Sequence, residues 1–174
     1  MADRPDEIVL ARHRDLKGRQ WHPWVRRGLL ALLGVPIVLG VANVFGQHQS
    51  AASASAPAAT LSVNAPSSIR GGLLFTVSFT VRAHAELKKA TLVLDPGWID
   101  GMQVNSINPQ PVDEASRNGR VVLDLGHIPA GELVTYWIEF QVNPTTVGRR
   151  RQDVELDDGP KQILTAHRTL MVYP

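Results

Sequence analysis

A run of nineteen uncharged, mostly apolar residues near the N-terminus constrains this chain more than any other feature. The run extends from Gly28 to Gly46 and directly follows two arginines, Arg26 and Arg27. An α-helix of that length covers roughly 28 Å, which is close to the hydrocarbon thickness of a bilayer. The sequence therefore predicts a single transmembrane helix over residues 28–46.

The distribution of positive charge predicts the orientation of this helix. Residues 1–27 contain seven Lys or Arg residues against four acids, whereas residues 47–69 contain no Lys or Arg. The positive-inside rule places the basic flank in the cytoplasm. We therefore expect residues 1–27 to form a basic cytoplasmic tail, and the C-terminal part to be extracytoplasmic at the cell membrane. The residues expected at the membrane interface are Trp21, Trp24, Arg26 and Arg27.

A cleaved signal peptide is the alternative interpretation of the apolar run. Ala54-Ser55-Ala56 has the small residues of a cleavage site. However, 27 residues precede the run, the run itself exceeds the roughly 7–15 residues that are usual in signal peptides, and Pro57 follows the best cut. We expect the anchor to be retained.

Gly34, Pro36 and Gly40 lie within the run. Small residues let a neighbouring helix approach closely in a membrane, so these three predict a helix-packing face. A plain anchor is the alternative, because Gly and Pro are common in transmembrane helices. After the run, residues 47–60 (QHQSAASASAPAAT) have almost no large apolar side chains and predict a flexible Ala/Ser-rich linker.

From Leu61 onward the apolar residues recur at every second position, which is typical of half-buried strands. The clearest series is Phe75, Val77, Phe79 and Val81. Turn signals such as Asp95-Pro96-Gly97 and Asn118-Gly119 separate the candidate strands. Residues 61–174 therefore predict a mainly β, antiparallel β-sandwich of seven to eight strands.

Two stretches carry a resemblance to known families. LDLGHIPAGELVTYWIEFQVNP (residues 123–144) resembles the E–F region of fibronectin type III and related bacterial cell-surface sandwiches. LSVNAPSSIRGGLLFTVSFTV (residues 61–81) resembles the A–B region of bacterial adhesion-related, Ig-like domains. The resemblance covers residues 61–174 and implies an Ig-like fold. It specifies little of the function, because such domains serve adhesion, assembly and spacing alike.

The sequence offers little support for catalysis. It contains no cysteine, which excludes disulfides, thiolate metal sites and cysteine nucleophiles. It contains none of the common phosphate-binding or nucleophile motifs, so we expect no enzyme activity and no cofactor. Asp157-Asp158-Gly159 lacks the spacing of an EF-hand and is interpreted as a solvated hairpin turn. We predict no metal site.

Charge and composition give two further expectations. Residues 61–174 carry eleven Lys or Arg against twelve acids, so the high pI comes largely from the tail and does not favour nucleic-acid binding. Fourteen Arg against four Lys indicates a GC-rich, bacterial genome.

Two segments are candidates for contact with a partner. Arg149, Arg150 and Arg151 follow a predicted strand and could bind lipid headgroups, an acidic polymer or an acidic protein surface; a solvated loop is the alternative. Trp98, Ile99 and Met102 lie in a predicted loop. They form either an exposed aromatic anchor or a cap on the open end of the sandwich.

The favoured hypothesis is a non-enzymatic accessory or interaction subunit that presents the sandwich outside the cell. Its expected partners are the lipid bilayer and another integral membrane or envelope protein. An extracytoplasmic module for cell-wall glycan or another ligand is the alternative. A signalling adaptor, whose basic tail is read in the cytoplasm, is a third possibility.

Overall fold

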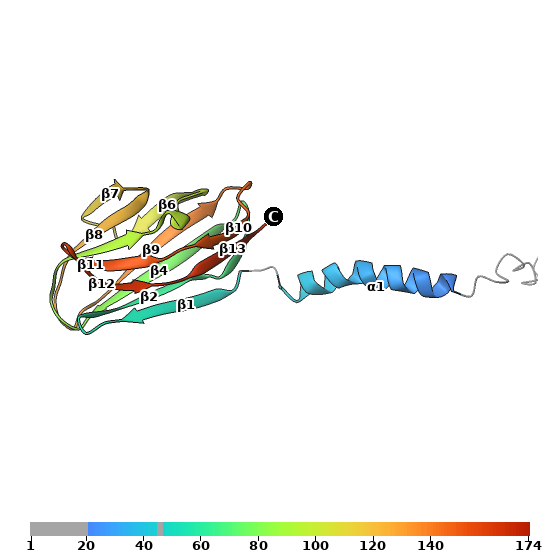
Figure 1. Ribbon diagram of the computed structural model, residues 1–174, viewed down its shortest axis with the longest axis horizontal. Coiled ribbons are helices and arrows are strands. Elements are labelled where there is room, and N and C mark those ends of the chain that lie inside the picture. Colours follow the sequence, from blue (N-terminus) through green and yellow to red (C-terminus); the bar gives the residue numbers. More distant parts are fainter. Residues whose placement is uncertain (1–20, 45–46) are drawn as a thin grey trace, which may run out of the picture. The chain divides into compact units, whose positions relative to one another are not determined.

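The computed structural model describes residues 21–44 and 47–174 of the chain (Figure 1). The chain divides into two compact units, Met1–Val44 and Phe45–Pro174. Residues 1–20 of the predicted tail, and residues 45–46 at the end of the predicted span, lie outside the described residues. The cytoplasmic tail therefore stays a prediction, and the signalling adaptor stays a third possibility.

Within residues 21–44, the first unit contains one helix, α1 (His22–Val41). It begins six residues before Gly28. Pro23 lies in its first turn, where backbone N–H groups have no partner within the helix, so a proline there loses no hydrogen bond and favours a helix start. It ends at Val41, and Asn43 then adopts the left-handed conformation common just after helices. The helix is long and apolar enough to cross a bilayer, with a mean hydropathy of 1.6 over its most apolar window.

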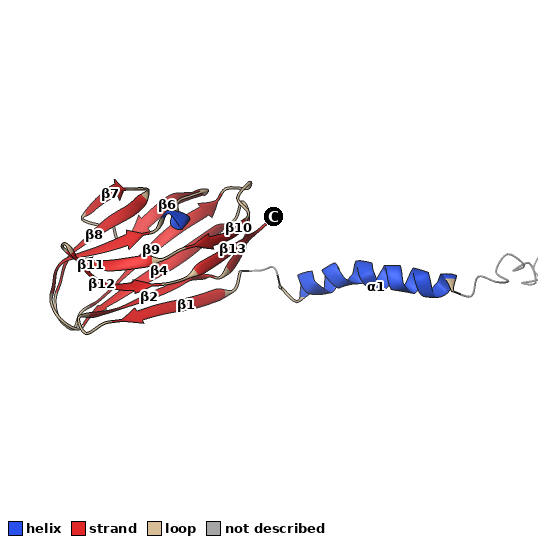
Figure 2. Ribbon diagram, in the orientation of Figure 1, coloured by secondary structure: helices blue, strands red, loops and turns tan. Residues whose placement is uncertain are grey.

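The second unit is made of strands and one short 3-10 helix (Figure 2). The strands in chain order are β1 (Gln49–Ser55), β2 (Ala59–Pro66), β3 (Ser68–Arg70), β4 (Leu74–Ala83), β5 (Leu87–Leu94), β6 (Met102–Asn108), β7 (Asp113–Arg117), β8 (Arg120–Ile128), β9 (Leu133–Val142), β10 (Gly148–Arg151), β11 (Val154–Asp158), β12 (Lys161–Ala166) and β13 (Thr169–Tyr173). The 3-10 helix η2 (Pro96–Trp98) lies between β5 and β6.

These strands form three sheets. Sheet A has the order β1-β2-β4-β9-β6, sheet B the order β10-β13-β3, and sheet C the order β12-β11-β5-β8-β7. All recorded pairings are antiparallel except the one between β13 and β3. The predicted β-sandwich is confirmed, and the thirteen strand segments exceed the seven to eight expected. The excess comes from short or polar strands such as β1, β7 and β10, which carry no apolar alternation.

The core follows the predicted alternation. Phe75, Val77, Phe79 and Val81 on β4 are all buried, and they face the buried residues of β9 across a ladder that pairs Phe79 with Tyr136. The intervening side chains of β4 point to the outer face of sheet A. Burying one face of each sheet against the other gives a single apolar core.

The predicted flexible linker is wrong for most of its length. Residues 49–55 form β1, which pairs with β2 from Gln49↔Pro66 to Ser55↔Thr60. The composition argument failed because an edge strand needs backbone hydrogen bonds and does not need large apolar side chains. The small side chains Ala54, Ala56 and Ala58 pack against the core. The sandwich therefore begins near residue 49 rather than at Leu61.

Candidate interaction surfaces

Trp98 lies in the centre of the core and not on the surface. Its side chain has no exposed area, and its ring centroid lies 5.3 Å from that of Phe79 and 5.4 Å from that of Phe140. Met102 is also buried and Ile99 is half-buried. Of the two alternatives for Trp98, Ile99 and Met102, the exposed aromatic anchor is therefore wrong. The loop instead caps the sandwich.

Gly97 explains how the indole of Trp98 reaches the core. A Cβ atom at Gly97 would lie 1.8 Å from the carbonyl oxygen of Arg151, so only glycine allows η2 to approach β10 this closely. The indole Nε1 then donates to the carbonyl oxygen of Asp153 at 3.2 Å. The buried polar edge of the ring is thus satisfied without water.

Asp153 is a buried carboxylate held by three donors. Its Oδ2 accepts hydrogen bonds from Nε of Arg151 at 2.6 Å and from Nδ1 of His167 at 2.8 Å. Its Oδ1 accepts from the backbone N–H of Arg168 at 3.3 Å. Burial alone would raise the pKa of Asp153, but the hydrogen bonds from Arg151, His167 and Arg168 together hold this pKa below its usual value.

Arg168 is the buried cation of the same cluster. Its Nη1 donates to Oε1 of Gln152 at 3.2 Å and its Nη2 to the carbonyl oxygen of Pro66 at 2.6 Å. Its guanidinium carbon lies 5.1 Å from the centroid of the Trp98 ring, within cation–π range. Burial lowers the pKa of Arg168 to about 10, so the side chain stays charged at neutral pH. The cluster joins the end of β2 to the segments that precede β11 and β13.

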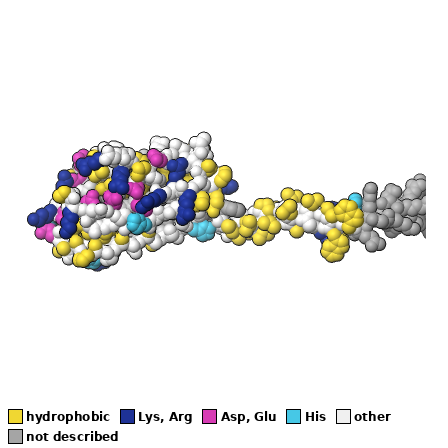
Figure 3. Space-filling model, viewed as in Figure 1, with side chains coloured by type: hydrophobic (Ala, Val, Ile, Leu, Met, Phe, Trp, Pro, Cys, Tyr) yellow, Lys and Arg dark blue, Asp and Glu magenta, His cyan; other side chains and the backbone are white. Residues whose placement is uncertain are grey.

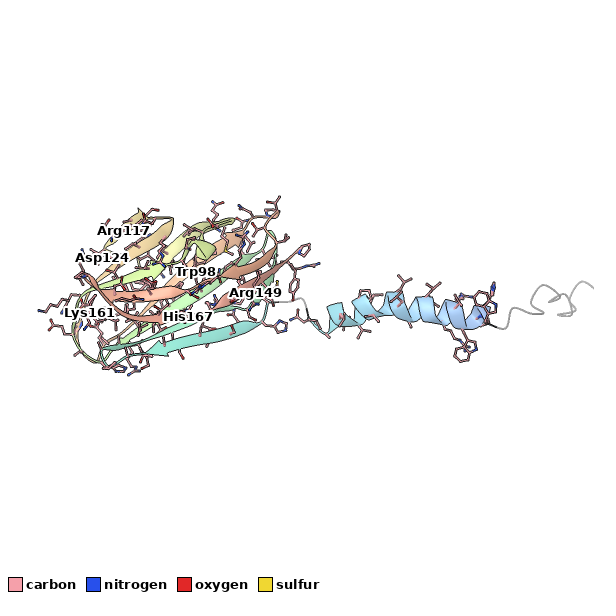
Figure 4. The ribbon with its side chains drawn as sticks, in the orientation of Figure 1. Trp98, Arg117, Asp124, Arg149, Lys161 and His167 are labelled. Atoms are coloured by element: carbon pink, nitrogen blue, oxygen red, sulfur yellow. The ribbon has the colours of Figure 1, made fainter. Side chains whose placement is uncertain are left out.

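The predicted arginine triplet is divided between two faces of β10. Arg150 pairs with the buried Leu170, whereas Arg149 and Arg151 pair with Met171 and Thr169 on the outer face. Figure 4 labels Arg149 and His167 around the β10–β13 pair, with Trp98 nearby. A shallow hollow of about 580 Å³ lies over this face. Its lining residues are Arg149, Arg151, Asp153, His167, Arg168 and Thr169.

A larger hollow of about 640 Å³ lies on the outer face of sheet C. Its floor consists of alternate residues of β5, β8 and β11, and β7 forms one wall. Figure 3 shows acidic and basic side chains intermixed on the visible face of the sandwich. Three ion pairs organise this face: Lys89–Asp124 at 3.5 Å, Arg120–Asp95 at 2.9 Å and Arg120–Glu155 at 3.0 Å.

Asp157 is the unsatisfied group in this charged hollow. Its Oδ1 is buried and has no hydrogen-bond partner in the described part of the chain. Burial raises the pKa of Asp157, the negative charge of Glu155 raises it further, and Arg120 opposes this only in part. Buried polar atoms are normally hydrogen-bonded, so the fold leaves the desolvation cost of this carboxylate without compensation.

The outer face of sheet A has the opposite character, because it carries few charges. Trp137 is 48% exposed at the middle of this face, directly opposite Ser78 on β4 and Asn108 on β6. The hydroxyls of Thr80 and Thr135 form a cross-strand hydrogen bond at 3.1 Å. The face is thus a hydroxyl-rich and amide-rich surface with one exposed indole.

No residue of α1 is buried, and all are exposed except Gly34 and Leu39, which are half-buried. The guanidinium of Arg27 lies 5.2 Å from the ring centroid of Trp24, while the interface role of Trp21, Trp24, Arg26 and Arg27 stays a prediction. The prediction that Gly34, Pro36 and Gly40 pack against a neighbouring helix stays a prediction. At about 100° per residue, Pro36 and Gly40 share a face, whereas Gly34 lies roughly 120° from Gly40.

Sequence reasoning missed Asp153, Arg168 and Trp137 as notable residues, and it placed Asp157 in a solvated turn. The sequence did contain a signal for Asp157 and Trp137. Buried Val154 and Leu156 imply that Glu155 and Asp157 point outward together, and the parity of β9 turns Trp137 outward. No local signal predicts the cluster of Asp153 and Arg168, because its contacts join residues as far apart as Arg168 and Pro66.

Comparisons with known proteins assign no family. No family model matches the chain, and no curated protein matches it. The solution structure of CaCohA2 from Clostridium acetobutylicum is similar over 68% of this chain and 92% of its own, with 13% identity and a TM-score of 0.46. The Pseudomonas fluorescens alkylpurine DNA glycosylase AlkC bound to DNA containing an abasic site analog is similar over 63% of this chain, with 17% identity and a TM-score of 0.35. The match spans only 28% of that second protein. Likenesses this distant assign neither a ligand nor a partner.

Proposed function

We propose that this chain is a non-enzymatic, single-pass membrane protein that presents its sandwich outside a bacterial cell and binds another membrane or envelope protein there. The length and composition of α1 support the anchor. The seven Lys or Arg residues before the predicted span, and the absence of Lys and Arg from residues 47–69, support a cytoplasmic N-terminus. The sandwich carries the interaction surface.

The observation that carries the proposal is the unpartnered carboxylate of Asp157 in the charged hollow of sheet C. A partner that places a Lys or Arg in the hollow would offset the negative charge of Asp157, which lines it. It would also meet a fixed pattern of both charge signs, because Lys89 and Arg120 are already paired with Asp124 and Glu155. Such patterns set the specificity and register of protein interfaces more than their raw affinity.

Site-specific photo-crosslinking in cells tests this proposal. A photoreactive amino acid at Ala115, which lines the hollow, should give a discrete protein adduct, whereas the same residue at Ala130, in the β8–β9 turn, should not. Asp157→Asn should reduce the Ala115 adduct by about tenfold, because it removes the negative charge that a basic side chain of the partner would offset.

The matched control is Asp100→Asn, an exposed acid in the turn after η2. It should leave the adduct unchanged. Asp157→Asn is not expected to unfold the domain, because it removes a poorly solvated charge from a site that raises the carboxyl pKa. An adduct that survives Asp157→Asn at full yield, or an equal adduct at Ala115 and Ala130, would contradict the proposal.

Trp137 favours a second candidate function, the binding of a neutral cell-wall glycan on the outer face of sheet A. An exposed indole offers a flat apolar surface on which a sugar ring can stack, and the neighbouring Ser78, Asn108 and Thr135 offer hydrogen-bond groups. Sedimentation of the detergent-solubilised chain with insoluble cell-wall glycan tests this function. Trp137→Ala should abolish co-sedimentation and Leu133→Ala, an exposed leucine of β9, should not. Equal losses, or no binding by the unaltered chain, would exclude it.

A further inference from the structure

One end of the sandwich combines exposed apolar side chains with arginines, and the chain enters the domain at this end. Nε2 of Gln47, just before β1, donates to the carbonyl oxygen of Leu74 at 3.2 Å. The turn before Leu74 is tied to the ends of β13 and β9, through Gly71 N–H to Tyr173 O and Gly72 N–H to Val142 O. We call this the proximal end and define it by Arg70, Leu73, Leu74, Val147, Arg149 and Arg150.

The apolar side chains of the proximal end are open to solvent. Leu73, Leu74 and Val147 are between 43% and 53% exposed. Leu73 and Val147 lie in the β3–β4 and β9–β10 connections, and Leu74 is the first residue of β4. In Figure 3, hydrophobic side chains gather where β10 and β13 approach the C-terminus marked in Figure 1. Exposed apolar groups that gather in this way mark a contact surface.

The charge of the proximal end has one sign. The segments 47–49, 66–74, 141–151 and 171–174 contain Arg70, Arg149, Arg150 and Arg151, but no Asp or Glu. The adjoining segments contribute two acids: Asp100, in the turn next to Asn143, and the buried Asp153, which pairs with Arg151. The opposite end has mixed charge, with Glu86 and Glu132 in its turns and Lys88 and Lys161 near the starts of β5 and β12.

The chain length between the anchor and the sandwich limits how far this end can be from a membrane. Only residues 42–48 separate the end of α1 from the start of β1. Even a fully extended chain of seven residues spans at most about 25 Å. If α1 is anchored as proposed above, the proximal end is held near the bilayer surface, where anionic headgroups attract arginine and the interface accepts apolar side chains.

We propose that the proximal end is a lipid-binding surface that docks the sandwich onto the anionic bilayer holding α1. Leu73, Leu74 and Val147 enter the interface, while Arg70 and Arg149 contact lipid phosphates. This inference rests on the proposed membrane anchor, but not on the partner proposed for sheet C. Docking fixes the tilt of the sandwich and leaves the charged hollow open to a partner.

The absence of cysteine from the natural sequence allows a clean test with one label per chain. An environment-sensitive dye is attached at Thr145→Cys, an exposed position in the β9–β10 connection, or at Ala130→Cys at the opposite end. The full chain is placed in nanodiscs that contain a spin-labelled quencher lipid, with either anionic phosphatidylglycerol or neutral phosphatidylcholine. Co-elution with the nanodisc confirms the anchor separately.

We expect quenching of the Thr145→Cys label in anionic nanodiscs and little quenching of the Ala130→Cys label. Replacing Arg70 and Arg149 by glutamine should lower the ratio of docked to free sandwich by about fivefold for each arginine. Replacing Leu73, Leu74 and Val147 by serine should also reduce quenching, whereas Leu133→Ser at the opposite end should not.

Three results would overturn the inference. Equal quenching at the two positions would show that the sandwich does not dock by its proximal end. Quenching that is the same in neutral and anionic nanodiscs, and insensitive to both sets of substitutions, would exclude the proposed contacts. Quenching that disappears when each nanodisc holds a single chain would identify a second copy, rather than lipid, as the occupant. The crosslink at Ala115 reports independently on the partner proposed for sheet C.

Discussion

Trp98 and Trp137 show how one residue type serves two purposes in the same sandwich. Trp98 has no exposed area and contacts Phe79, Phe140 and the guanidinium of Arg168, whereas Trp137 is 48% exposed on the outer face of sheet A. Burial of an indole removes a large apolar area from water, and its loss leaves a cavity. The two residues should therefore differ sharply in their contribution to stability.

We predict that Trp98→Ala lowers the free energy of unfolding by about 3–5 kcal/mol, because a buried tryptophan leaves a cavity on truncation. Trp137→Ala is the matched control and should cost about 0.5 kcal/mol or less, as is usual for exposed positions. Urea unfolding of the full chain in detergent, followed by circular dichroism of the strands, measures both values. Similar losses for the two variants would show that the core is not organised around Trp98.

The lowered pKa of Asp153 predicts a pH dependence of stability. Because this carboxyl is more acidic in the folded chain than its ordinary value of 3.8, it stabilises the fold fully above that value. The contribution is lost as the pH falls below 3.8 and through the lowered native pKa. Asp153→Asn should be less stable at neutral pH. Its free energy of unfolding, measured in urea, should also fall less steeply between neutral pH and about pH 2 than that of the unaltered chain. An equally steep fall in both proteins would mean that other carboxylates control acid unfolding.

At the scale of elements, the sandwich begins earlier than the composition of residues 47–60 suggests. β1 pairs with β2 over seven residues, although its sequence QSAASAS has no large apolar side chain. We predict that amide hydrogen exchange, measured by mass spectrometry, shows protection in the 49–55 segment that is well above that of the exposed turn at Pro129–Gly131. Unprotected amide exchange throughout residues 49–55 would instead support a flexible linker.

The elements that could be predicted are those with apolar alternation. β4 and β9 have it, and the parity of Phe79 and Ile138 follows from the sequence because one face of each strand must be buried. β1, β7 and β10 lack it, because these edge strands are specified by backbone pairing, which needs no apolar face. Whether Trp98 is buried or exposed could not be predicted from the sequence either. Whether a loop tryptophan turns inward depends on the close approach of Gly97 to Arg151, which no local pattern encodes.

At the scale of the whole molecule, two separate surfaces of the sandwich have two different proposed functions. The charged hollow of sheet C contains the unpartnered Asp157 and faces a protein partner in our proposal. The proximal end carries arginines and exposed leucines suited to an anionic bilayer. All of these assignments depend on one claim, that the chain is retained in the membrane with its sandwich outside the cell.

Single-cysteine accessibility in intact cells tests that claim most directly, because the natural chain has no cysteine to confuse the result. A membrane-impermeant maleimide is applied to cells expressing the full chain with Ala130→Cys in the sandwich or His13→Cys in the N-terminal tail. The account predicts labelling of Ala130→Cys without lysis, labelling of His13→Cys only after lysis, and recovery of both at full length in the membrane fraction. Labelling of His13→Cys in intact cells, or a mature chain that begins after residue 50, would contradict the account.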